Sequence, residues 1–249
     1  MTVPKVAIGI PYYKHWEGRF GMCAMDLAMR SAASCAMLPI ECTGAYVEDN
    51  RNGAVKFALE YEAQAGIQFD WMFWMDTDMI FPGDALTRLI AHDKDIVGAN
   101  YRQRRPPYGF TGHYLDGQDT HLLEPGLHPM GHLATGLLLV RFDIYRKLPY
   151  PWFDAALVSE QPRDDVYFCR KAVEAGYEIW CDHDLTFQVR HIGEQEIEWF
   201  TSDQIRPLIA GAELNMKTSS EIGHENVAAA VRQAEAARDA KVAYHEAAE

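Results

Sequence analysis

The chain has 249 residues, enough for one large α/β domain with a tail or for two small domains, and we favour the single domain. Hydrophobic residues make up 48% and charged residues 24%, an ordinary globular composition, and no apolar run approaches the roughly 20 residues that span a bilayer. The formal net charge of -13 argues against broad electrostatic capture of nucleic acid or anionic membrane, although it does not exclude a local basic groove.

The first residues and the cysteines indicate the compartment. Met1 to Lys5 leads directly into a short apolar stretch, without the basic start and longer apolar region of a signal peptide. The five cysteines are an odd number and form no C-x-x-C pair, so neither a disulfide framework nor a zinc site is indicated. These features predict a cytoplasmic protein without a membrane anchor.

Strand-like and helix-like stretches alternate from the start of the chain, which predicts an α/β fold with a doubly wound, mostly parallel sheet flanked by helices. We expect a buried strand at Lys5 to Ile10 and then a helix within residues 19–37 whose methionines belong to the core. After the strand, Pro11-Tyr12-Tyr13 forms an aromatic loop that either receives a flat ring, such as a nucleotide base, or packs without a ligand.

The second strand and helix carry a candidate phosphate site. A weaker strand at Ile40 to Val47 precedes a helix opened by Arg51-Asn52-Gly53, with Asp49 or Asn50 as its cap. Arg51 and Asn52 at this helix start either contact a diphosphate or ribose, or are a solvated Arg beside a capping Asn.

The most informative stretch is an apolar run that ends in two carboxylates. Phe69 to Met75 predicts a buried central strand, and the DxD triplet Asp76-Thr77-Asp78 follows it. Ligands bind at the carboxyl ends of strands in open α/β sheets, so the position favours a site. Two aspartates this close, beside apolar surface, call for a nearby cation such as Mg²⁺ or Mn²⁺. Two solvated acids at a turn are the usual interpretation of an isolated Asp-x-Asp triplet.

Beyond the acidic turn we expect a short helix at Asp84 to His92 and a strand at Asp95 to Tyr101. A long loop from Arg102 to about Gly131 follows, and its arginines either pair with a phosphate or an acidic acceptor or are solvated. The glycine pair Gly131 and Gly136 precedes a strongly apolar strand and allows the backbone to approach a ligand or a neighbouring strand closely.

The last third of the chain carries further candidate groups. After a short helix at Phe142 to Leu148, the aromatic loop around Trp152 forms either a wall for a sugar ring or a hydrophobic plug. Asp164 and Asp165 open a helix that stops at Gly176, where they either stabilise the helix start or accept a proton from a hydroxyl. His191 at the end of a late strand is either a metal ligand or an ordinary core or surface histidine.

Six short motifs, in this order, resemble nucleotide-sugar glycosyltransferases of the GT-A fold, especially small family-two-like enzymes, over about Lys5 to Gly193. They are the first strand ending in Pro11, the Arg51-Asn52 helix start, Asp76-Thr77-Asp78, Ala134-Thr135-Gly136-Leu137, Asp164-Asp165-x-x-Phe168-Cys169 with Gly176, and His191-Ile192-Gly193.

The resemblance implies metal-dependent transfer of a sugar from a UDP- or GDP-linked donor to an acceptor hydroxyl. It implies that Asp78 binds Mn²⁺ (or Mg²⁺) directly, that Asp76 binds the ribose or helps to hold the metal through water, and that His191 is the third protein ligand. Asp165 matches the usual catalytic base of inverting members, and Asp164 replaces the family's Glu, which leaves open which acid acts. The donor-side residues are Pro11, Tyr12, Arg51, Asn52, Asp76 and Thr77, and the acceptor-side residues are Thr135, Gly136 and Trp152.

We divide the chain into a catalytic domain at residues 1–195 and a helical C-terminal extension at 196–249, which is a frayed tail or the contact of a homo-oligomer. The acceptor stays open among a glycan, a lipid-linked sugar, a protein and a modified nucleic-acid base. A nucleotidyltransferase usually has a Gly-rich basic phosphate loop, which Pro11-Tyr12-Tyr13-Lys14 is not. A non-catalytic nucleotide- or sugar-binding module is the other alternative.

Overall fold

The computed structural model describes residues 3–104, 109–114, 124–155, 163–193 and 196–197, all within one compact unit of the chain. The predicted C-terminal extension therefore lies almost entirely outside the described residues, and its helices and oligomer contact remain predictions. None of the helices in the described ranges is long and apolar enough to cross a membrane.

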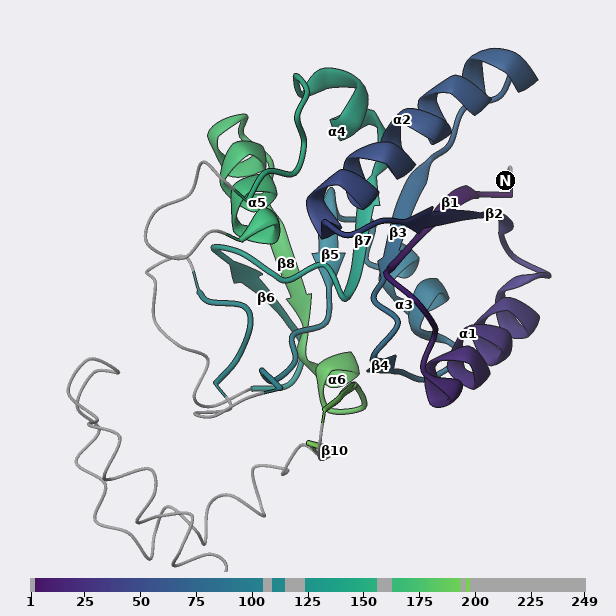
Figure 1. The fold of residues 1–249 in the computed structure, drawn as a ribbon. Helices are drawn as coiled ribbons and strands as arrows, with labels where there is room; N and C mark the ends of the chain where they lie inside the picture. The colour runs from purple at the N-terminus through teal and green to yellow at the C-terminus, as the bar shows by residue number, and fades with distance from the viewer. Residues whose placement is uncertain (1–2, 105–108, 115–123, 156–162, 194–195, 198–249) are drawn as a thin grey trace, which may run out of the picture. The chain divides into compact units, whose positions relative to one another are not determined.

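The elements that the sequence predicts occur in the predicted order, and further short strands lie between them, one of them at Leu127–Met130 within the predicted long loop (Figure 1). The described strands and helices are β1 (Lys5–Tyr12), α1 (Gly18–Ser31), β2 (Ala36–Thr43), α2 (Val47–Ala65), β3 (Trp71–Met75), β4 (Met79–Ile80), α3 (Ala85–Ala91), β5 (Ile96–Gly98), β6 (Leu127–Met130), β7 (Leu137–Arg141), α4 (Phe142–Lys147), α5 (Asp164–Glu174), β8 (Ile179–Asp182), α6 (His183–Thr186), β9 (Arg190–Ile192) and β10 (Glu196–Ile197).

The described strands form a seven-stranded sheet in the order β2-β1-β3-β7-β5-β8-β6 and a small sheet in the order β10-β9-β4. In the large sheet β7 and β6 pair antiparallel with their neighbours, while β2, β1, β3, β5 and β8 share one direction. The α/β class is confirmed, and the sheet is mixed. The described part of the segment between β5 and β7 contains β6 and no helix, and β7 returns antiparallel between β3 and β5.

Helices cover both faces of the large sheet, as Figure 1 shows. One hydrophobic cluster joins the sheet to α2, α4 and α5, and the other joins it to α1, α3 and α6. All five residues of β3 are buried, with Met72 and Trp74 in the first cluster and Trp71, Phe73 and Met75 in the second. The apolar run of β3 is therefore a central strand covered on both sides, as predicted, and it fixes the position of the acidic turn that follows.

The methionines of α1 are not in the core, contrary to the prediction. Met22, Met25 and Met29 are 66%, 56% and 67% exposed, whereas Phe20 and Leu27 are buried against the sheet. The apolar residues of this helix form two stripes on about opposite faces. The sheet covers the stripe that contains the bulky Phe20, so the methionine stripe is left in solvent.

The predicted start of α2 is also wrong. Its N-cap is Tyr46, without a side-chain cap, and the helix begins at Val47, about one turn before Arg51. Glu48 and Asp49 therefore lie inside the first turn, where their charges favour the positive end of the helix dipole. As a consequence Arg51 lies within the helix and is buried, rather than at its exposed start.

Candidate active site

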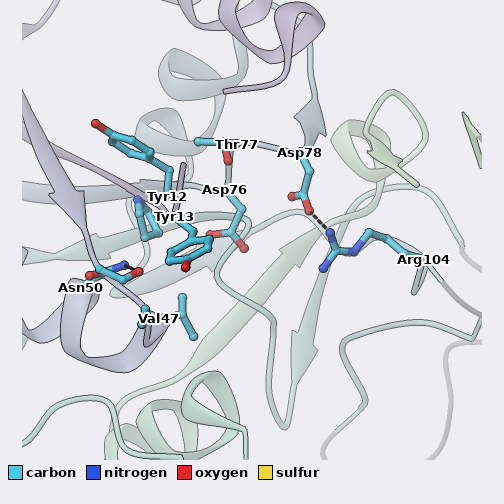
Figure 2. Close-up of a pocket in the computed structure, with 11 residues that line it drawn as sticks. Tyr12, Tyr13, Val47, Asn50, Asp76, Thr77, Asp78 and Arg104 are labelled. Atoms are coloured by element: carbon cyan, nitrogen blue, oxygen red, sulfur yellow. Dashed lines mark hydrogen bonds and ion pairs between the residues drawn. The ribbon is translucent and has the colours of Figure 1, made fainter. Parts of the chain in front are cut away.

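A cleft of about 280 Å³ lies where β1 and β3 end (Figure 2). Figure 2 shows Tyr13, Val47 and Asn50 on one side, Arg104 on the other, and the acidic turn between them. The lining residues are Pro11, Tyr12, Tyr13, Gly44, Ala45, Val47, Asn50, Asp76, Thr77, Asp78 and Arg104. The carboxyl ends of two parallel strands and the start of α2 thus meet at one opening, as the general rule for α/β sheets predicts.

The backbone of the acidic turn is held from two sides. The N–H of Asp76 donates to the carbonyl of Gly136 at 3.0 Å, and the N–H of Ile192 donates to the carbonyl of Asp78 at 2.7 Å. The first bond ties the turn to the segment before β7, and the second ties it to β9. The two carboxylates therefore project from a rigid backbone, as a site that must hold a ligand in fixed geometry requires.

Asp76 is paired with a buried arginine. Arg51 is 4% exposed, and its Nη2 donates to Oδ1 of Asp76 at 2.8 Å while its Nη1 pairs with Oδ2 of Asp164. Burial raises the pKa of Asp76 above its ordinary value, partly opposed by Arg51. Burial acts to lower the pKa of Arg51, but the two carboxylates raise it, so the guanidinium stays charged. The guanidinium of Arg51 thus joins the acidic turn to the start of α5.

Asp165 follows Asp164 at the start of α5 but makes a different set of contacts. Its Oδ1 accepts the N–H of Val166 at 2.7 Å, and within the described residues it forms no ion pair. Burial and the charge of Asp164 raise the pKa of Asp165 to about 6, against the opposing effects of Arg51, Val166 and Arg163. Asp165 is therefore a carboxyl group that exchanges its proton near neutral pH.

Asp78 meets His191 and Arg104 at a single oxygen. Its Oδ2 lies 2.7 Å from Nη1 of Arg104 and 3.3 Å from Nε2 of His191. Nδ1 of His191 lies 2.8 Å from the carbonyl of Arg102, which can only accept, so Nδ1 carries a proton. Burial acts to raise the pKa of Asp78, but His191 and Arg104 lower it below its ordinary value.

The pair of Asp78 and His191 fits a divalent cation. Oδ2 of Asp78 and Nε2 of His191 lie 3.3 Å apart, and both atoms are of types that bind divalent cations, the nitrogen once it carries no proton. The hydrogen bond from Nδ1 to a backbone carbonyl is the support that metal-binding histidines usually have. Asp76 is turned toward Arg51 instead.

In the part of the chain that the structure describes, no three His, Cys, Asp or Glu residues are grouped to hold a metal. A cation held by Asp78 and His191 therefore needs oxygen ligands from water or from a phosphate, which Mg²⁺ and Mn²⁺ commonly take.

The remaining predicted donor-side residues divide into two groups. Pro11, Tyr12 and Thr77 line the cleft. Asn52 does not: its amide accepts the N–H groups of Trp152 and Phe153 at 3.1 and 3.2 Å and donates to the carbonyl of Phe153 at 2.7 Å. Asn52 thus holds the aromatic loop that follows α4.

The predicted acceptor-side residues are all buried. Trp152 is 5% exposed and donates its indole N–H to the carbonyls of Tyr145 and Leu148, so it acts as the hydrophobic plug that the sequence also allowed. Gly136 donates its N–H to the hydroxyl of Tyr101 at 2.9 Å, and Thr135 is 1% exposed with a hydroxyl that has no partner among the described residues.

Sequence reasoning missed several residues of the cleft. Asn50 was predicted only as a helix cap, and Val47 only as the end of a strand, yet both line the cleft because α2 starts earlier than expected. The pairing of Arg104 with Asp78 was missed as well, because the arginines after β5 were candidates for pairing with a phosphate or an acidic acceptor. Tyr101, whose ring lies 5.1 Å from that of His191, had no sequence signal of its own.

No protein family model and no curated protein sequence match the chain. Among solved structures, A197 from STIV is 14% identical with a TM-score of 0.50, and the match covers 76% of this chain and 85% of that one. The chain has a GT-A-like fold. A mutant of Drosophila β-1,4-galactosyltransferase 7, in complex with manganese, UDP-Gal and xylobiose, is 14% identical with a TM-score of 0.48, over 82% and 79% of the two chains. At such identities a likeness concerns the fold and not the activity. In this GT-A-like fold, the cleft lies at the carboxyl ends of β1 and β3.

Proposed function

We propose that the protein is a metal-dependent glycosyltransferase that moves a sugar from a nucleoside-diphosphate donor to an acceptor hydroxyl, with inversion and with Asp165 as the base. The observation that carries the proposal is the link made by Arg51. It ties Asp76, in the turn that lines the cleft, to Asp164, the neighbour of the candidate base. The ordered motifs and the GT-A-like fold support the same activity.

The contacts of the two acids favour Asp165 over Asp164 as the base. A base must be free to accept a proton, and Asp164 is committed to a buried guanidinium. With a pKa of about 6, the carboxylate of Asp165 is ionised at neutral pH. The pKa is also close enough to neutral pH for the carboxylate to take up a proton from a substrate. In this proposal Asp165 removes the proton of the acceptor hydroxyl, and Asp164 keeps Arg51 in place.

The lining of the cleft suits a nucleotide. The volume of the cleft, about 280 Å³, is close to the lower end of small-molecule pockets, about 300 Å³. Tyr13 and Val47 offer apolar surface to a base, and the amide of Asn50 lies among the lining groups. Nδ2 of Asn50 donates one N–H to the carbonyl of Gly44 at 3.2 Å, which leaves its second N–H and its Oδ1 for a ligand.

In this proposal Asp78 and His191 hold Mn²⁺ or Mg²⁺. The ion, when bound, supplies stabilisation of the negative charge that develops on the departing diphosphate. The chain itself contributes the orientation of both ligands: Ile192 fixes the backbone of Asp78, and the carbonyl of Arg102 fixes the ring of His191.

The test combines binding and turnover. Purified protein is incubated with a panel of UDP- and GDP-sugars and Mn²⁺, and nucleotide binding and nucleoside-diphosphate release are measured for the parent, Asp78→Asn and Asp165→Asn. We expect Asp165→Asn to keep Mn²⁺-dependent nucleotide binding and to lose about 10²- to 10⁴-fold in turnover. We expect Asp78→Asn to lose both.

Three results contradict the proposal. Binding and turnover that do not depend on Asp78 exclude the metal role. Binding that survives in both Asp165 forms, with no turnover of any donor, favours a non-catalytic binding module. Pyrophosphate release from a nucleoside triphosphate instead favours nucleotidyl transfer.

A further inference from the structure

Arg104 pairs with the oxygen of Asp78 that a bound cation would need. Its Nη1 lies 2.7 Å from Oδ2 of Asp78, the same oxygen that faces Nε2 of His191 at 3.3 Å. The side chain of Arg104 is 56% exposed, whereas those of Asp78 and His191 are 22% and 12% exposed. The guanidinium is therefore the most exposed of the three groups, and Figure 2 shows it paired with Asp78.

A cation at Asp78 and His191 competes with this guanidinium. Both need the charge of Asp78, and two positive groups on one oxygen repel each other. Arg104 must then leave Asp78, and its charge needs another partner. Among the described residues that line the cleft, Arg104 carries the only positive side chain, while Arg51 is buried and already pairs with two carboxylates.

The backbone just before Arg104 is anchored to the segment at Gly109 and Phe110. Gln103 donates its N–H to the carbonyl of Gly109 at 2.8 Å, and Arg102 forms a bridge with Phe110. The carbonyl of Arg102 also holds the ring of His191. The segment from Arg102 to Arg104 thus orients His191 and also carries the arginine that competes with a cation for Asp78.

We propose that Arg104 changes partner during binding: it pairs with Asp78 in the free protein and with the diphosphate of the donor once a divalent cation binds Asp78. This inference rests on the proposed function. Arginine suits the second role because its fork of N–H groups matches phosphate oxygens. The consequence is that cation and nucleoside diphosphate bind cooperatively, because each removes the obstacle that Arg104 presents to the other, and the coupling is reciprocal.

The experiment measures Mn²⁺ binding by titration calorimetry or by the EPR signal of free Mn²⁺, without nucleotide and with saturating UDP or GDP. Nucleotide binding is measured with and without Mn²⁺. In Arg104→Ala we expect Mn²⁺ alone to bind about 2- to 5-fold more tightly, as the loss of a partly exposed ion pair implies. We expect UDP or GDP to bind about tenfold more weakly in the presence of Mn²⁺. The coupling between the two ligands should shrink accordingly.

Arg30→Ala is the matched control. Arg30 forms an exposed ion pair of 2.8 Å with Asp26 on α1, so its loss removes the same charge away from the cleft and should change neither affinity. Arg104→Lys keeps the charge without the fork, and should keep Mn²⁺ binding near the parent value while weakening the nucleotide. Melting curves check that each variant is folded.

Opposite shifts of the two affinities in Arg104→Ala support the inference. Unchanged or weaker Mn²⁺ binding overturns it, and so does unchanged nucleotide affinity. Asp78→Asn separates this failure from failure of the proposed function. If Asp78→Asn weakens Mn²⁺ binding but Arg104→Ala gives no opposite shifts, only the inference fails. If Asp78→Asn leaves Mn²⁺ affinity unchanged, both fail.

Discussion

Replacing Arg51 by methionine should destabilise the fold strongly and in a pH-dependent way. Arg51 is 4% exposed and is the counterion of Asp76 and Asp164, with Asp165 next to them. Methionine keeps much of the side-chain volume but leaves the buried Asp164 and the partly buried Asp76 without their cation. Removal of one partner from a buried ion pair costs about 3–5 kcal/mol. That is a large part of the roughly 5–15 kcal/mol that stabilises a typical domain.

The dependence on pH follows from the sign of the pKa shift. The pKa of Asp76 is raised by burial even with Arg51 present, and Arg51 lowers it, so the variant raises it further. An acid whose pKa is raised in the folded state favours folding below its unfolded pKa, and this contribution is lost as the pH rises through the folded value. The loss in Arg51→Met should therefore be larger at about pH 8 than at about pH 5.

Urea unfolding of the full chain, followed by tryptophan fluorescence at both pH values, measures this effect. Arg30→Ala serves as the control, since its exposed pair should be worth less than about 1 kcal/mol. A loss below about 1 kcal/mol for Arg51→Met at pH 8, or a larger loss at pH 5, contradicts the argument.

Three further predictions concern the proposed base and the backbone of the site. Turnover should fall about tenfold per pH unit below a pKa of about 6, because Asp165 must be ionised to accept a proton, and a pH–rate profile that is flat through this region contradicts the assignment. Asp164→Asn should keep an acidic limb, moved to lower pH because the charge of Asp164 no longer raises the pKa of Asp165, and should unfold at lower urea because it removes a partner of Arg51; loss of the limb would assign the base to Asp164 instead. Gly136→Ala should lower the free energy of unfolding by about 1–3 kcal/mol, because the Cβ of the new alanine would lie 2.4 Å from the hydroxyl of Tyr101. Gly53→Ala, in an open position inside α2, should instead stabilise by about 0.5–1 kcal/mol, and equal effects of the two substitutions in the same urea assay would contradict the packing argument.

The sequence predicted those parts of the fold whose signals are local. The continuous apolar run from Trp71 to Met75 matches β3 because a strand covered on both faces needs no alternation. The acids in the first turn of α5 and Gly176 after it mark the ends of that helix, and Gly176 has the positive φ of 91° that a helix stop of this kind uses.

What the sequence could not predict depends on contacts between distant segments. Periodicity identifies apolar stripes on α1 but does not say which one faces the sheet, and this is why the methionines were misplaced. The ion pair of Arg51 with Asp164 spans 113 residues, and no local pattern connects its two partners. The direction of β7 likewise depends on its pairing with β3 and β5.

The same separation has a consequence for biosynthesis. Arg51 and Asp164 lie 113 residues apart, so at about 5–20 residues per second the ribosome needs roughly 6–20 s to make the second partner after the first. During that interval the guanidinium lacks one of the two carboxylates that neutralise it in its buried position. The nascent N-terminal half therefore cannot complete its interior before α5 emerges, and the link between the acidic turn and the proposed base forms only late in translation.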